Sequence, residues 1–157
     1  MWKKIKPFVA GIAIAWGVGI LSALLTRGNM GLYDEIARPP LSPPMVLFPI
    51  VWGILFTLMG VSSALIWRER ENGTDTGTAL RIYALQLAVN FFWSIIFFNM
   101  RAFLFAFIWI MLLWALIIVM ITQFRRINKT AAYLQLPYLI WVTFAAYLTL
   151  MIFLMNG

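Results

Sequence analysis

The stretch AFLFAFIWIMLLWALIIVMITQF, residues 102–124, contains no charged side chain. An uninterrupted apolar run of about 18 residues or more is typical of a transmembrane helix. At roughly 1.5 Å per residue, such a run crosses a hydrocarbon core of roughly 30 Å. Four further charge-free runs are long enough to do the same: Phe8–Thr26, Leu41–Trp67, Ile82–Met100 and Thr130–Gly157. The sequence therefore predicts an all-α integral membrane protein, a bundle of five transmembrane helices that forms a single domain over residues 1–157.

The first of these runs follows a basic flank, Lys3, Lys4 and Lys6, as the apolar core of a signal peptide would. Cleaved signals have an apolar core of about 7–15 residues, and the run Phe8–Thr26 is longer. We therefore expect a retained first helix. The composition agrees, since 64% of the 157 residues are hydrophobic and 11% are charged.

The basic residues divide unequally between the two sides of this bundle. Nine of the 12 fall on the side of the N-terminus, namely Lys3, Lys4, Lys6, Arg68, Arg70, Arg81, Arg125, Arg126 and Lys129. The other three are Arg27, Arg38 and Arg101. Because cytoplasmic loops carry an excess of Lys and Arg, we expect the N-terminus in the cytoplasm and the C-terminus outside, in a bacterial cell membrane. The net charge of +7 then orients the protein in the lipid bilayer and does not indicate a nucleic-acid partner.

The residues that the chain lacks exclude several kinds of chemistry. It contains no Cys and no His, which argues against disulfides, thiol catalysis, the usual zinc sites and histidine-ligated haem. We therefore predict no metal site and no resident cofactor. All five acidic residues lie in the expected loops: Asp34, Glu35, Glu69, Glu71 and Asp75. Ion-coupled pumps normally carry ionisable groups at membrane depth, so a pump of that kind is not expected.

The connections between the spans also carry information. A long first loop covers residues 27–44, and a polar second loop covers residues 68–81. The third link, Asn99–Arg101, is so short that spans three and four must be antiparallel neighbours. In the first span, small residues recur at every fourth position: Gly11, Ala15, Gly19 and Ala23. Such a stripe lets another backbone approach closely, either within the bundle, which we favour, or in a homodimer.

Three spans carry polar and aromatic side chains at offsets of three and four, which keep them on one helix face. The three faces are Pro49, Trp52, Phe56 and Met59; Gln86, Asn90, Trp93 and Phe97; and Tyr138, Trp141, Ala145 and Leu148. Such stripes are usually packing, and an intramembrane Asn usually bonds another helix. Together, however, aromatic walls and a few amides suit a large, flat, mostly apolar ligand.

Three motifs resemble those of the TspO/MBR family, the tryptophan-rich sensory proteins related to the translocator protein or peripheral benzodiazepine receptor. The first, LYDEIARPPLSPPMVLFPIVW, covers the long loop and the start of the second span, residues 32–52. The second, QLAVNFFWSIIFF, covers residues 86–98, and the third, PYLIWVTFAAYL, covers residues 137–148. Their order, the number of spans and the loop lengths extend the resemblance over essentially the whole chain.

The resemblance implies a five-helix bundle with a pocket that the long first loop covers as a lid. It also implies ligands: porphyrins such as protoporphyrin IX, isoquinoline carboxamide and benzodiazepine-like drugs, and sterols as a further class. Carried over by position, the pocket residues would be Tyr33, Pro43, Trp52, Phe56, Asn90, Trp93, Ser94, Tyr138, Trp141 and Ala145. The family's light-driven breakdown of porphyrins would make Trp52 and Trp141 redox partners, without a conventional catalytic constellation.

The prolines of the first loop gain a role from this resemblance. Proline fixes φ and restricts the residue before it, so Pro39, Pro40, Pro43 and Pro44 would stiffen the lid and reduce the entropy lost when it orders over a ligand. Pro49 would lie in the first turns of the second helix, or kink it if it lies deeper.

The chain also departs from the family pattern. Leu41 stands where many members have an aromatic residue, Phe56 replaces a common tyrosine, and Thr149 replaces an asparagine. No basic residue follows Tyr147, so the forward cholesterol motif is absent, although Lys129, Tyr133 and Leu136 fit the reversed one. Sterol binding is accordingly less expected than porphyrin binding.

These features leave three hypotheses for the function. The first is a membrane receptor for tetrapyrroles that promotes their light-dependent oxidative breakdown and so regulates tetrapyrrole levels or a stress response. The second is a transporter of porphyrins, lipids or sterols that uses the same pocket. The third is a packing or regulatory subunit whose pocket is incidental. Saturable porphyrin binding separates the third from the others, and flux into proteoliposomes separates a transporter from a receptor.

Overall fold

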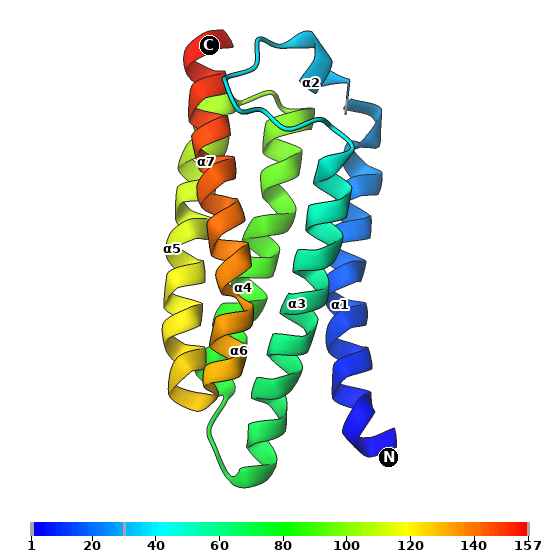
Figure 1. Ribbon diagram of the computed structural model, residues 1–157, viewed down its shortest axis with the longest axis vertical. Helices are drawn as coiled ribbons and strands as arrows, with labels where there is room; N and C mark the ends of the chain where they lie inside the picture. The colour runs from blue at the N-terminus through cyan, green and yellow to red at the C-terminus, as the bar shows by residue number, and fades with distance from the viewer. Residues whose placement is uncertain (1, 30, 157) are drawn as a thin grey trace.

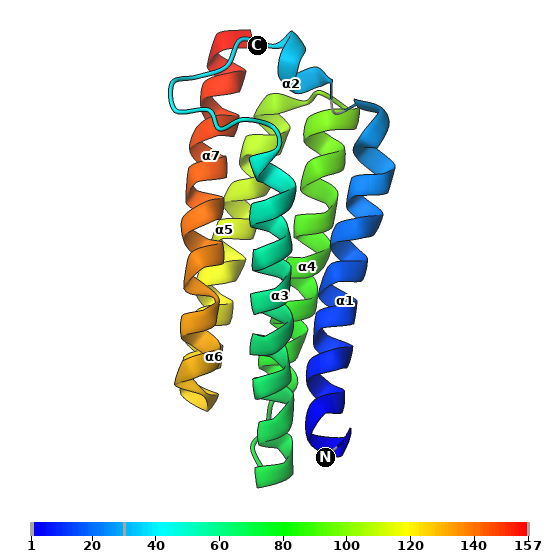
Figure 2. The ribbon, with the colours of Figure 1, turned by 45° about the vertical axis from the view of Figure 1, so that its right-hand side comes forward.

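The computed structural model describes residues 2–29 and 31–156, and the last residue of the predicted fifth span, Gly157, lies outside them. The helices form a bundle whose axes run roughly along its length (Figures 1 and 2). Their bounds are α1 Trp2–Thr26, α2 Leu32–Glu35, α3 Leu47–Arg68, α4 Gly77–Ser94, α5 Phe103–Ile127, α6 Lys129–Leu134 and α7 Leu136–Asn156. Short 3₁₀ turns follow α1 and α3 at Arg27–Asn29 and Glu69–Asn72, and a π-helical turn, Ile95–Asn99, continues α4.

Within the described residues, five helical segments are long and apolar enough to cross a membrane, as the sequence predicts. Their ends differ from the charge-free runs. The second span begins at Leu47 rather than Leu41, because residues 41–46 belong to the loop that Pro43 and Pro44 hold out of helical geometry. The third span begins at Gly77 rather than Ile82, because the helix continues past the apolar run into polar residues.

The fifth span consists of two helices, α6 and α7, where the sequence predicts one. The break falls at Gln135, two residues before Pro137. Proline has no N–H to donate to the carbonyl of the preceding turn, and its ring crowds that carbonyl. A helix interrupted at this point can change direction before it enters the bundle. Pro49, by contrast, lies in the first turn of α3, where proline is tolerated.

The stripe of small residues on α1 packs inside the bundle, against α3. A Cβ atom added to Gly11 would lie 2.5 Å from the Gly60 carbonyl oxygen, and one added to Gly60 would lie 2.5 Å from the Ile12 Cα atom. Only hydrogen fits between the two backbones at these positions. Ala15 is fully buried, and the Phe56 ring lies against Gly19. The prediction of internal packing is therefore confirmed.

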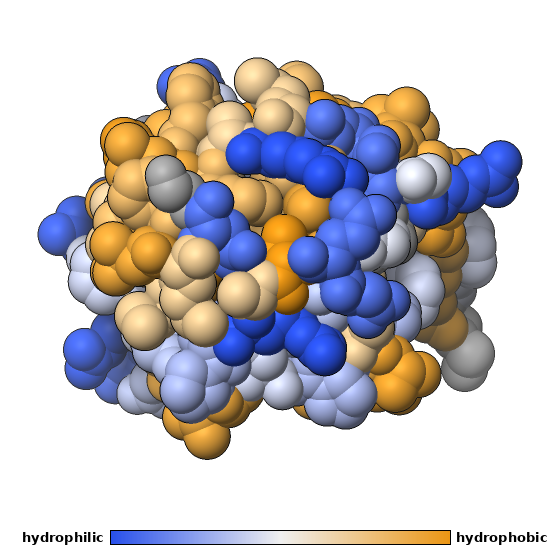
Figure 3. Space-filling model, turned by 90° about the horizontal axis from the view of Figure 1, so that it is seen from above, coloured by the Kyte–Doolittle hydropathy of each residue, from blue (hydrophilic) through white to orange (hydrophobic). Residues whose placement is uncertain are grey.

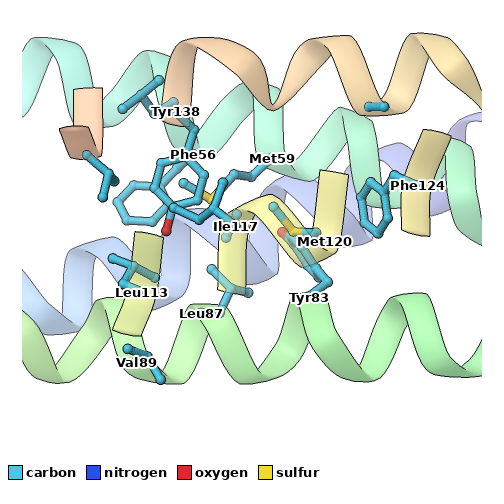
Figure 4. Packing of buried hydrophobic residues seen from close by; sticks show 14 of the residues in the cluster. Phe56, Met59, Tyr83, Leu87, Val89, Leu113, Ile117, Met120, Phe124 and Tyr138 are labelled. Carbon is cyan, nitrogen blue, oxygen red and sulfur yellow. The ribbon is translucent and has the colours of Figure 1, made fainter. Parts of the chain in front are cut away.

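The larger of two core clusters fills the half of the bundle toward the N-terminus, and a smaller one lies at the other end: Leu32, Ile96, Phe97, Ala106 and Ile152. Figure 4 shows buried side chains from α3, α4, α5 and α7 that point toward one another, among them Met59, Tyr83 and Met120. Phe124 extends the same cluster toward the end of α5. Ser62 also lies there, fully buried, and its hydroxyl donates to the Ala131 carbonyl at 2.7 Å. This packing leaves little space between the helices at that end.

The chain alternates between the two ends of the bundle. The N-terminus and the α3–α4 link lie at one end, and α2, the α4–α5 link and the end of α7 lie at the other (Figure 1). The two helices joined by the short link, α4 and α5, are packed neighbours, as predicted. From the α2 end, hydrophilic side chains gather over the middle of the molecule, with hydrophobic ones around its edge (Figure 3). We refer to residues 31–46, which cross this end, as the lid.

Candidate ligand-binding site

A cavity of about 560 Å³ lies beneath the lid, between α1, α3, α4 and α7. Its walls are apolar apart from a few hydroxyl, amide and indole groups. The lining residues are Trp16, Gly19, Ile20, Ser22, Ala23, Thr26, Tyr33, Met45, Val46, Phe48, Pro49, Trp52, Gly53, Phe56, Asn90, Trp93, Ser94, Phe97, Phe98, Trp141, Ala145, Leu148, Thr149 and Ile152. A cavity of this size and character is typical of small-molecule sites.

The structure brings the sequence-predicted residues together, and all but two of them line the cavity. Pro43 lies behind the lining, where its carbonyl accepts a hydrogen bond from the Tyr33 hydroxyl at 2.7 Å. Tyr138 also lies behind it, almost fully buried, with its ring 6.2 Å from that of Trp52. Both residues therefore support side chains that face the cavity rather than face it themselves.

Two groups of aromatic rings form a wall of the cavity from the lid to the floor. The rings of Tyr33 and Phe48 meet edge to face with centroids 5.4 Å apart, and Phe48 meets Trp141 in the same way at 5.8 Å. Deeper, Trp52 and Phe56 lie one helical turn apart, with their rings 5.5 Å from each other. Aromatic pairs at these distances contribute about 0.5–1.5 kcal/mol beyond the area they bury. The wall is therefore held in place before a ligand arrives.

The lid is fastened to α7 by hydrogen bonds from its backbone. The Ala37 N–H donates to Asn156 Oδ1 at 2.9 Å, and Asn156 Nδ2 donates back to the Ala37 carbonyl at 2.8 Å. Three residues after Ala37, the Pro40 carbonyl accepts a hydrogen bond from the Tyr147 hydroxyl at 2.9 Å. Leu41 then turns the chain in a left-handed conformation, with φ of 70°. These contacts place the lid across the mouth of the cavity.

Two further contacts involve charged side chains of the lid. Arg101 forms an ion pair of 3.1 Å with Glu35, and the Arg38 guanidinium lies 5.0 Å above the centre of the Tyr33 ring. The ion pair is exposed on both sides, and surface pairs contribute about 0–1 kcal/mol. The ion pair therefore adds little to the stability of the lid.

The floor of the cavity contains a chain of three polar side chains. Asn90 Nδ2 donates to the Tyr138 hydroxyl at 2.7 Å, and that hydroxyl donates to Gln86 Oε1, also at 2.7 Å. Gln86 is fully buried, and Asn90 is the member of the chain that lines the cavity. The amides that the sequence places at membrane depth thus find their partners in each other, through Tyr138.

Two residues that line the cavity, Trp93 and Trp141, have indole N–H groups without an acceptor among the described residues. Both N–H groups are buried, and an unpaired donor in an apolar environment costs about 1–3 kcal/mol. Thr149, by contrast, already donates to the Ala145 carbonyl at 2.7 Å. The nitrogen atoms of the two indoles have almost no accessible surface, so each ring must turn before its N–H can donate to a carbonyl or carboxylate of a ligand.

The contribution of α1 is the part of the site that the sequence reasoning missed. Trp16, Ser22 and Thr26 line the cavity from this helix, and Trp16 Nε1 donates to Thr57 Oγ1 on α3 at 2.9 Å. The stripe of small residues could have indicated this contribution, since two of its members, Gly19 and Ala23, line the cavity. That stripe indicates close packing but does not say which residues around it face a cavity.

The side chains around the cavity are mostly apolar and aromatic. Among residues 2–29 and 31–156, no three His, Cys, Asp or Glu side chains lie close enough to hold a metal ion. The chemistry that the cavity does offer is aromatic: several rings that can stack on a flat ligand, including the four indoles of Trp16, Trp52, Trp93 and Trp141, which can be oxidised.

Comparison with known proteins gives a consistent result. The model of the TspO/MBR family matches residues 10–155. The chain is 34% identical over 157 residues to the tryptophan-rich protein TspO of Chlorobaculum tepidum, covering 99% of both chains. It is 34% identical over 132 residues to the translocator protein of Ovis aries, covering 83% of this chain and 78% of that one. It is 33% identical over 113 residues to the tryptophan-rich sensory protein of Cereibacter sphaeroides, covering 72% and 69%.

Proposed function

The chain belongs to the TspO/MBR family, and on that premise we propose that it is a membrane receptor for porphyrins such as protoporphyrin IX. Related hydrophobic ligands, including isoquinoline carboxamides and benzodiazepine-like drugs, bind at the same site. The observation that carries the proposal is the aromatic cavity of about 560 Å³ beneath the lid. A flat, largely apolar ligand gains from stacking on its walls, and the lid excludes water above it.

The polar groups of the cavity fit the edge of such a ligand. Porphyrins of this kind carry carboxylates on an otherwise apolar ring. The indole N–H groups of Trp93 and Trp141 have no acceptor among the described residues and would donate to a carboxylate once the rings turn toward it, and Arg38 stands in the lid beside Tyr33. The ring would occupy the aromatic part of the cavity, and its carboxylates would point toward these donors.

The bound porphyrin is also the light absorber in the second part of the proposal, its oxidative breakdown. The excited ring passes its energy to dissolved oxygen, and the reactive oxygen then attacks the ring. Trp52 and Trp141, which line the cavity, act as redox partners in this process. This chemistry requires no general acid, base or metal.

A transporter is the alternative function, and the packing below the cavity favours the receptor. A carrier must open its site to each side of the membrane in turn. Met59, Gln86 and Tyr138 close the floor of the cavity and are at most 1% exposed, and the core continues beneath them to the far end (Figure 4). Opening that side would require the helices to separate along much of their length.

Titration of the purified protein with protoporphyrin IX in the dark tests the proposal, with quenching of tryptophan fluorescence as the readout. Ala23 lines the cavity but is exposed on α1, so Ala23→Phe should fill part of the space without disturbing the core. Ala13→Phe, at an exposed position on the same helix outside the cavity, is the matched control. We expect saturable binding by the native protein and the control and at least tenfold weaker binding by Ala23→Phe. Equal binding by all three proteins would place the porphyrin elsewhere.

A further inference from the structure

The two hydrogen bonds that join Asn90, Tyr138 and Gln86 in the cavity floor run in one direction, from Asn90 through Tyr138 to Gln86. The Tyr138 hydroxyl is in contact with Gln86 Oε1 on one side and with Asn90 Nδ2 on the other, both at 2.7 Å. Gln86 and Tyr138 are at most 1% exposed and do not line the cavity, whereas Asn90 does. The three side chains therefore connect a buried amide to the ligand site through one hydroxyl group.

The single hydroxyl proton of Tyr138 decides which of its neighbours donates and which accepts. A phenol has one proton to donate, and Tyr138 donates it to Gln86 Oε1. Toward Asn90 the hydroxyl can then only accept, so Asn90 must turn its NH₂ group to Tyr138. As a result, the carbonyl oxygen Oδ1 is the part of the Asn90 amide that remains for a ligand.

From this geometry we propose that Gln86 is a positioning residue that sets the hydrogen-bonding polarity of the cavity floor, acting on Asn90 through Tyr138. With Gln86 in place, the floor presents a hydrogen-bond acceptor. Without an acceptor at residue 86, the tyrosine proton would turn to Asn90 Oδ1, the amide would reverse, and the floor would present a donor. This inference rests on the proposed function, because it gives a chemical preference to the same ligand site.

The energetics of Gln86 support a role beyond packing. Its Nε2 group is buried and has no partner among the described residues, and an unsatisfied amide inside a membrane protein is costly. A methionine of similar length would fill the position without that cost. The stabilising contribution of the Gln86 amide therefore comes from its carbonyl oxygen, Oε1, which accepts the hydrogen bond of the Tyr138 hydroxyl.

The proposal specifies the class of ligand that the site prefers. The floor accepts a hydrogen bond at Asn90, while Trp93 and Trp141 have N–H groups to donate. The matching molecule is flat and apolar, has an N–H or O–H directed toward α4, and carries a carbonyl or carboxylate directed toward the indoles. A ligand with acceptors alone would leave the Asn90 carbonyl unpaired.

Two probes that differ in one donor test this preference: an isoquinoline carboxamide with a secondary amide, and its N-methylated tertiary counterpart. The quantity measured is the ratio of their dissociation constants, secondary over tertiary. In Gln86→Met we expect this ratio to rise about fivefold, the effect of one exchanged hydrogen bond. Gln135→Met is the matched control, since Gln135 is also fully buried but makes no hydrogen bond to Tyr138 among the described residues. Its ratio should stay within twofold of the native value.

The route through Tyr138 is tested by repeating Gln86→Met in a Tyr138→Phe background. Without the hydroxyl, residue 86 cannot influence Asn90, so the ratio should no longer respond to the substitution. A ratio that is unchanged in Gln86→Met, or that changes equally with and without the Tyr138 hydroxyl, would overturn the proposal. Non-additivity of this kind is what a double-mutant cycle detects.

A spectroscopic measurement decides the proposal even if neither probe binds. Difference infrared spectra of native protein and Gln86→Met should show the Tyr138 C–O stretch moving, with Tyr138→Phe used to identify that band. The side-chain carbonyl stretch of Asn90 should move to lower wavenumber in Gln86→Met, because Oδ1 then accepts a hydrogen bond from Tyr138. An absence of probe binding with these shifts present would reject the binding of isoquinoline carboxamides at this site, but would leave the positioning role of Gln86 supported. If neither band shifts, Gln86 does not act on Asn90 through Tyr138, and the proposal is overturned.

Discussion

Trp52 and Trp141 reach the cavity from α3 and α7, and the proposed photochemistry depends on them. Phe at either position keeps an aromatic face and most of the apolar area, but removes the N–H and the easily oxidised ring. We therefore expect a Trp52→Phe/Trp141→Phe double variant to change porphyrin affinity by about 1 kcal/mol or less. Light-dependent loss of the bound porphyrin should slow sharply, as measured by absorbance under constant illumination.

Trp67→Phe is the control for this experiment. Trp67 lies at the end of α3 far from the lid, where the Arg70 guanidinium stacks 3.6 Å from its ring centre. Its replacement should alter neither binding nor photodegradation. Undiminished degradation by the double variant would reduce Trp52 and Trp141 to packing residues, and the breakdown would then be a property of the porphyrin alone.

At the level of single residues, helical spacing predicted the inward faces of α3, α4 and α7. It succeeded because offsets of three and four fix a face whatever the neighbours are. It could not separate Asn90, which lines the cavity, from Gln86 one turn away, which is sealed beneath it. That difference depends on how far the Tyr138 ring reaches from another helix, which a one-dimensional pattern does not contain.

The contact between α1 and α3 gives a prediction at the level of helices. A methyl group on Gly60 would meet the backbone of Ile12 at 2.5 Å, so Gly60→Ala should force the two helices apart. We expect a loss of about 1–3 kcal/mol, the usual effect of overpacking. Thermal unfolding in detergent, followed by tryptophan fluorescence, should show a lower midpoint.

Gly17→Ala provides the comparison, since nothing lies within 4 Å of a Cβ atom at that position on α1. Alanine has a higher helix propensity than glycine by about 1 kcal/mol, so this variant should be as stable as the native protein or slightly more so. Equal destabilisation of both variants would mean that any added methyl disturbs α1, and the close approach to α3 would have no special importance.

The lid should respond to ligand as an element of its own. Porphyrin is expected to protect residues 33–44 from limited proteolysis more than it protects the α3–α4 link, residues 69–76, at the opposite end of the bundle (Figure 1). Asn156→Ala removes both hydrogen bonds to Ala37 and should weaken that protection. If ligand protects the two loops equally, the lid does not cover the occupied site.

Sequence reasoning was less successful for the ends of these elements than for their existence. Residues 41–46 carry no charge, so the charge-free run that predicts the second span includes them. The four prolines at positions 39, 40, 43 and 44 already favoured a loop there. The break between α6 and α7 was missed for the opposite reason, because the apolar run continues through it. In both places backbone restriction by proline decided the structure, and hydropathy does not report it.

The whole molecule has two unlike ends, one with a lid over a cavity and one filled by core. The three basic residues Arg27, Arg38 and Arg101 lie at the lid end, and the chain alternates so that the other nine fall toward the opposite end. A reporter fused to the C-terminus should therefore appear outside the cell, and one inserted in residues 69–76 should appear inside. Both reporters on the same side would be incompatible with five spans.

The measurement that tests the central claim most directly is a structure of the protein determined with protoporphyrin IX bound in the dark. We predict density for the ring inside the cavity, against Trp52 and Phe56, with its carboxylates toward Trp93 or Trp141 and the lid closed above it. Density for the porphyrin only on the lipid-facing surface, with the cavity unoccupied by it, would contradict the account.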